Sequence, residues 1–104
     1  MVKVEVLYQQ DQILSIHISG HAKYAKKGED LVCAGASSIG IGALNALDEI
    51  FSNNVRLEQR ENKILIKVLN NSKELQDTLN FMIIQYKTME EAYPENITII
   101  RKEV

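Results

Sequence analysis

The sequence predicts an α+β domain in which a mainly antiparallel sheet carries two helices on one face. Four segments alternate apolar and polar residues and pair across two-residue turns, and two longer segments place apolar residues at intervals of three and four. The order is β-β-α-β-β-α-β. A chain of 104 residues suits one domain, so we expect residues 1–104 to form a single unit.

The composition and net charge indicate a globular protein and give no sign of a membrane or nucleic-acid partner. Apolar residues make up 45% of the chain and charged residues 25%, as in ordinary globular proteins. The formal charge is −2, which predicts neither a membrane surface nor direct contact with nucleic acid. The N-terminal segment alternates charge with valine, and no run approaches the ~18 apolar residues of a membrane helix, so we expect a cytoplasmic protein.

The strands follow from period-two alternation. The first hairpin turns at Gln10-Asp11, between the alternating residues Val2, Val4, Val6 and Tyr8 and the alternating residues Leu14, Ile16 and Ile18. The second pairs Val55–Arg60 with Lys63–Val68 across Glu61-Asn62. A last strand is expected over Ile97–Arg101.

The helices follow from the wider spacing. The first is expected from about Leu31 to Ser52, with a buried stripe of Ala36, Ile39, Ala43, Leu47, Ile50 and Phe51. The second starts after Asn71, which resembles a capping box with Glu74, and ends before Pro94. Its stripe is Leu75, Leu79, Met82, Ile83, Tyr86 and Met89.

Three glycines interrupt the first helix. Gly35, Gly40 and Gly42 each cost about 1 kcal/mol relative to alanine. We expect close approach to the sheet or to the second helix to compensate for this loss.

The longest connection, Ala22 to Asp30, leads to the single cysteine. If Asp30 is the N-cap, Cys33 takes the third helical position, where the positive end of the helix dipole favours a thiolate. His21, at the end of the second strand, can supply an imidazolium partner. One cysteine excludes an internal disulfide, and no cysteine pair exists for a zinc ribbon or a C-x-x-C motif.

A thiolate and an imidazole are the minimum for cysteine acyl transfer. The amides of Cys33 and Ala34 would lie near the start of the helix and could form an oxyanion hole. Ser37 follows Cys33 by one helical turn on the same side and could hydrogen-bond at the site.

Each of these residues also has a structural interpretation. A lone cysteine in a small domain is more often a buried small apolar residue than a nucleophile. His21 could be a surface turn residue, Asp30 could only cap the helix, and Tyr24 and its neighbouring lysines could form a solvated loop. His17 lies on the polar face of its strand and is expected to be solvated.

One segment resembles a known family. The runs Gly20-His21-Ala22, Gly28-Glu29-Asp30-Leu31-Val32-Cys33-Ala34 and Ala36-Ser37 are similar to the signature of the ribosomal-processing cysteine proteases, the Prp family. The resemblance extends to chain length and element order, so it covers essentially the whole sequence. Gly35 departs from the family, which usually has alanine or a similar small residue there.

The resemblance implies a homodimeric bacterial endopeptidase that needs no cofactor or metal. Its substrate would be large-subunit ribosomal protein number twenty-seven, from which it removes a short N-terminal extension. The implied catalytic residues are His21 and Cys33, accompanied by Asp30 and Ser37.

The resemblance also implies that the loop between the two catalytic residues is ordered by substrate. The composition of Ala22–Gly28 agrees, since it holds two alanines, one glycine and three lysines. We expect this segment to act as a substrate lid, in which Tyr24 closes over an apolar side chain and Gly28 ends the loop.

Two other classes of function compete with the protease. One is a non-catalytic ribosome- or RNA-associated binding module, in which the lysine-bearing loop contacts phosphate and Cys33 is structural. The chain's overall acidity disfavours it. The other is a redox sensor with one cysteine, which lacks a resolving thiol in the chain.

Overall fold

The structure is a computed structural model, and it describes residues 1–20 and 29–104. The elements follow the predicted order. They are β1 (Val2–Gln9), β2 (Gln12–Ser19), α1 (Glu29–Phe51), β3 (Val55–Arg60), β4 (Lys63–Val68), α2 (Lys73–Ala92) and β5 (Ile97–Glu103).

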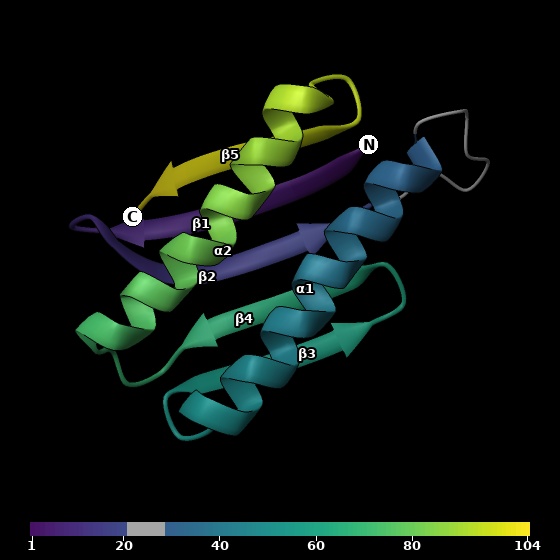
Figure 1. The fold of residues 1–104 in the computed structure, drawn as a ribbon. Coiled ribbons are helices and arrows are strands. Elements are labelled where there is room, and N and C mark those ends of the chain that lie inside the picture. The colour runs from purple at the N-terminus through teal and green to yellow at the C-terminus, as the bar shows by residue number, and fades with distance from the viewer. Residues whose placement is uncertain (21–28) are drawn as a thin grey trace.

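One five-stranded sheet runs in the order β3-β4-β2-β1-β5. Three of its four pairings are antiparallel, and β1 pairs with β5 in parallel. Both helices lie on the same face of the sheet (Figure 1). The predicted fold class is therefore confirmed, and the place of β5 beside β1 is a feature that local patterns did not predict.

Both predicted hairpins form. At the first turn Gln10 and Asp11 have φ values of 49° and 64°, the left-handed conformations that a two-residue turn of the matching twist requires. At the second turn Asn62 has φ 67°. Aspartate and asparagine tolerate this region better than most residues do, which suits Asp11 and Asn62, whereas Gln10 adopts it without such a preference.

The core lies between the sheet and the two helices. It is formed by one face of the strands together with one stripe of each helix, and its most deeply buried side chains include Val4, Val6, Ile13, Ile16, Ile66, Leu75, Leu79, Tyr86 and Ile97. An irregularity in the pairing of β1 with β2 lies near Ile13. The buried side chain of Gln76 satisfies the backbone there, accepting from the Ile13 amide at 2.8 Å and donating to its carbonyl at 2.9 Å.

Helix α1 differs from its prediction at one residue of the buried stripe and in its start. Ile50, expected in the buried stripe, is 70% exposed, whereas Leu44 is buried. The rest of the predicted stripe is confirmed: Ala36 and Leu47 are buried, and Ile39, Ala43 and Phe51 pack partly buried against the core. Val32 and Leu44 are also buried on this side of the helix. The helix begins at Glu29, so Asp30 is a helical residue and not the N-cap.

By length and composition alone, the 21 residues of Leu31–Phe51 could also cross a membrane. This is weak evidence, because the core helix of a globular domain passes the same test. Here the apolar stripe of the helix packs against the sheet.

Helix α2 is capped by a different residue from the one expected. Ser72 is the N-cap, and its hydroxyl accepts from the Leu75 amide at 3.1 Å. Asn71 lies outside the helix, where its side chain donates to Gln12 and accepts from Gln76. Serine and asparagine are about equally good caps, so the sequence could not choose between these neighbours.

The three glycines of α1 differ in how closely neighbouring atoms approach them. A Cβ on Gly40 would lie 2.7 Å from Ile64 Cδ1 and 3.0 Å from the Tyr86 hydroxyl, so α1 approaches both β4 and α2 there. A Cβ on Gly35 would meet only the flexible Met89 side chain. Gly42 has nothing within 4 Å, so close approach does not explain it.

We predict opposite effects of alanine at Gly40 and Gly42. Gly40→Ala should destabilise the fold by about 1–3 kcal/mol, because the added methyl overpacks the crossing of α1 with β4 and α2. Gly42→Ala is the matched control and should stabilise by up to ~1 kcal/mol through helix propensity. Urea unfolding measures both. Equal effects of the two substitutions would contradict the close approach at Gly40.

Candidate active site

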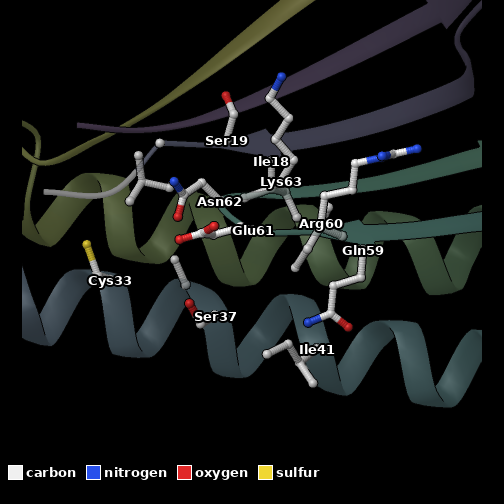
Figure 2. Close-up of a pocket in the computed structure, with 14 residues that line it drawn as sticks. Ile18, Ser19, Cys33, Ser37, Ile41, Gln59, Arg60, Glu61, Asn62 and Lys63 are labelled. Carbon is white, nitrogen blue, oxygen red and sulfur yellow. The ribbon is translucent and has the colours of Figure 1, made fainter. Parts of the chain in front are cut away.

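Cys33 lies on the wall of a groove. It is the fifth residue of α1, partly buried against the edge of the core. The groove has a volume of about 280 Å³ and is lined mainly by α1, the end of β2 and the turn between β3 and β4, together with Val2 of β1. Figure 2 shows the sulfur of Cys33 projecting from the helix on the side of this groove.

Ser37 shares this wall with Cys33, as the sequence predicted. It lies one helical turn further along α1, it lines the same groove, and its side chain is exposed. Ala36 and Ile41 complete the contribution of the helix. The helix thus presents one thiol and one hydroxyl to a groove with an apolar floor.

Gly20 brings the end of β2 to the groove and changes the direction of the chain there. Its φ is +82°, and a Cβ at this position would collide with the carbonyl oxygen of Met1. A glycine is therefore required on both conformational and steric grounds. Gly20 and Ser19 line the same groove as Cys33.

Several predicted site residues lie outside the described part of the chain. His21, Tyr24 and Gly28 belong to residues 21–28, so the dyad and the lid stay predictions. For Asp30 the structure gives the backbone, which is helical, and no side-chain environment.

The earlier start of α1 corrects the expected oxyanion hole. In a regular helix that begins at Glu29, the amides of Cys33 and Ala34 donate to the carbonyls of residues 29 and 30. The amides that a helix leaves without a partner inside the helix are those of its first four residues, all of which precede Cys33 here. Cys33 also lies beyond the first turn, where the dipole acts most strongly, so activation of the thiol depends more on a partner base.

The third wall, residues 59–63, was not predicted as part of the site. In Figure 2 the carboxylate of Glu61 points toward the side of Cys33 and Ser37, whereas the charged groups of Arg60 and Lys63 extend away from α1. The sequence indicated only a hairpin turn at Glu61-Asn62. No local pattern could show that this turn lies beside a cysteine some thirty residues away in the sequence.

A buried tyrosine fixes the helix beside the site. The Tyr86 hydroxyl donates to the Ala36 carbonyl at 2.8 Å, and the side chain is fully buried. Burial raises the pKa of Tyr86 above its usual value of 10.0, so this group remains a hydrogen-bond donor at neutral pH. It joins α2 to α1 one residue before Ser37.

The groove offers chemistry for a nucleophile and no evident metal site. Within residues 1–20 and 29–104, no group of three or more His, Cys, Asp or Glu side chains is placed to hold a metal ion. A partly exposed thiol on a groove wall is accessible to a substrate, as covalent catalysis by cysteine requires.

Comparison with known proteins supports this interpretation. The sequence model of the cysteine protease Prp family matches residues 1–98. The ribosomal processing cysteine protease Prp of Staphylococcus aureus strain Mu50 is 30% identical over 103 residues, which cover 95% of this chain and 97% of that protein. The Prp of Mycoplasma pneumoniae is 30% identical over 100 residues, covering 94% and 92%.

Solved structures agree. The crystal structure of the S. aureus ribosomal processing protease Prp in complex with a substrate peptide has a TM-score of 0.89 and 28% identity, covering 98% of this chain and 100% of that one. The same protease with a covalently linked product peptide has a TM-score of 0.86 and 29% identity. Because the family model matches nearly the whole chain and these relatives align with it over almost their full length, this chain belongs to the ribosomal-processing cysteine protease family Prp.

Proposed function

We propose that this protein removes the short N-terminal extension of large-subunit ribosomal protein number twenty-seven during ribosome assembly. The observation that supports this most directly is the exposed side of Cys33 in a groove bordered by the end of β2. Side chains of α1, Gly20 and the β3–β4 turn line this groove around the thiol, so a bound peptide could contact all three. The relative from S. aureus, bound to a substrate peptide, has the same fold.

The proposed catalytic pair is Cys33 and His21. His21 takes the thiol proton, and the Cys33 sulfur attacks the scissile carbonyl carbon, whose oxygen becomes an oxyanion. When the C–N bond breaks, His21 returns its proton to the leaving amine, and a thioester to Cys33 remains. A water molecule, deprotonated by His21, then hydrolyses the thioester and restores the thiol.

The proposed supporting residues act around this pair. Ser37 lines the groove beside Cys33, within reach of a bound peptide, and Asp30 lies one helical turn before Cys33. We propose that the protein works in the cytoplasm as a homodimer and without a cofactor. The alternative, a non-catalytic binding module with a structural cysteine, is less well supported, because Cys33 is only partly buried and borders a groove.

We predict that Cys33→Ala abolishes cleavage and preserves the fold. The sulfur is at the edge of the core, so its loss removes the nucleophile and leaves little cavity. Mass spectrometry of the extended ribosomal protein after incubation measures cleavage, and thermal unfolding measures the fold. Cleavage at the wild-type rate would exclude the mechanism, whereas unfolding of the variant would favour a structural cysteine.

We also predict that His21→Ala lowers cleavage by about 10²- to 10⁴-fold, because the thiol loses its base and the leaving amine its proton donor. Labelling of Cys33 by iodoacetamide at pH 6 should slow as well. His17→Ala is the control and should change neither, since His17 lies on the other face of the sheet, where its Nδ1 is 3.4 Å from Glu5 Oε2. Interchangeable effects of the two histidines would rule out the dyad.

A further inference from the structure

The face of the sheet opposite the helices carries an excess of positive charge. Within the described ranges, 1–20 and 29–104, no helix packs on this face, which we call the uncovered face. The strand registers place six basic residues there, Lys3, Arg56, Arg60, Lys63, Lys67 and Lys102, and two acidic residues, Glu5 and Glu58. The whole chain has more acidic than basic residues, so its charges are segregated.

The registers arrange these charges in three rows across the strands. The first basic row holds Arg56, Lys67 and Lys102, and the second basic row holds Arg60, Lys63 and Lys3. The acidic row between them holds Glu58, His17 and Glu5. Four residues along a strand separate the basic rows, a distance of about 13 Å.

Two pairs of like charges lie directly opposite each other in the β3–β4 hairpin. Arg56 faces Lys67 and Arg60 faces Lys63. Like charges in this position repel and weaken the pairing of strands. Arg56 is offset by an ion pair with Glu58 at 3.2 Å, whereas Arg60, Lys63 and Lys67 form no ion pair with any described residue. A bound anion would relieve this repulsion.

The uncovered face also has a hollow beside the pair Arg60 and Lys63. It measures about 230 Å³ and is lined by Arg60, Lys63, His17, Glu58 and Leu65. Figure 2 shows the charged groups of Arg60 and Lys63 on the side of the sheet away from α1. The second basic row thus borders a concave site that is separate from the Cys33 groove, although its two hairpin residues also line that groove.

We propose that the uncovered face binds double-helical RNA. Two parallel rows of cations can each contact one of the two phosphate strands that border the wide, shallow minor groove of an A-form helix. The acidic row would then face the groove, where 2′-hydroxyl groups can donate to Glu5 and Glu58. A second copy of this chain fits poorly, because the excess of positive charge on each face would repel the other.

This proposal departs from the expectation drawn from net charge, which treats the charges as evenly distributed. The placement of the charges on the uncovered face is given by the strand registers and does not depend on the proposed function. The choice of RNA as the polyanion rests on the proposed function, since a protease of ribosomal proteins meets its substrate where ribosomal RNA is present. Binding of RNA and cleavage of a peptide are separate measurements, so either can fail alone.

The test measures binding of a labelled 16-base-pair RNA duplex to the full chain at 50–200 mM salt. We expect the logarithm of the binding constant to fall linearly with the logarithm of the salt concentration. In Lys3→Gln/Lys67→Gln the salt slope should fall by roughly one for each lysine, with a loss of affinity on the order of tenfold or more. Neither lysine lines the Cys33 groove, so cleavage of a short peptide should be unchanged.

The matched control is Lys73→Gln/Lys87→Gln on α2, which should bind as the wild type does. Glu58→Gln should tighten binding, because it removes a repelling charge and keeps an acceptor oxygen, and a gain of this kind cannot come from misfolding. The proposal is overturned if the wild type binds no duplex RNA at 50 mM salt, or if both double variants lose affinity equally. Equal affinity for duplex DNA or for polyglutamate would overturn RNA as the occupant.

Discussion

The close crossing at Gly40 determines where the rest of the site lies. At this point α1 has no side chain, and Ile64 of β4 and the Tyr86 hydroxyl of α2 occupy the space a Cβ would need. Tyr86 also donates to the Ala36 carbonyl, so the helix is fixed to its neighbour within a few residues of Cys33. Because close-packed interiors transmit small changes in spacing, the height of α1 above the sheet sets the width of the groove.

The groove itself is assembled from three segments that are distant in the sequence. The start of α1 brings the thiol, the end of β2 brings the chain toward His21, and the β3–β4 turn adds a wall with Glu61. Each segment is held by a different constraint: apolar packing for the helix, a glycine conformation for the end of β2, and a two-residue turn for the hairpin.

The two faces of the sheet differ in what they carry. The face under the helices holds the core, and the groove opens at its edge. The uncovered face holds most of the sheet's charges in ordered rows, because strand alternation sends every second side chain there and the register aligns them. The β3–β4 hairpin contributes to both faces, because Arg60 and Lys63 line the Cys33 groove and also line the hollow on the uncovered face.

The sequence by itself determined the element order, both hairpins and the place of Ser37 one helical turn after Cys33, because period-two alternation, helical spacing and turn chemistry are local properties. It misplaced Ile50 and the cap of α2, where the choice depends on which neighbours the helices meet. Only the tertiary structure decided that β5 pairs in parallel with β1 and that the β3–β4 turn faces Cys33. Those contacts join residues far apart in the chain, and their free energy comes from packing that no local pattern encodes.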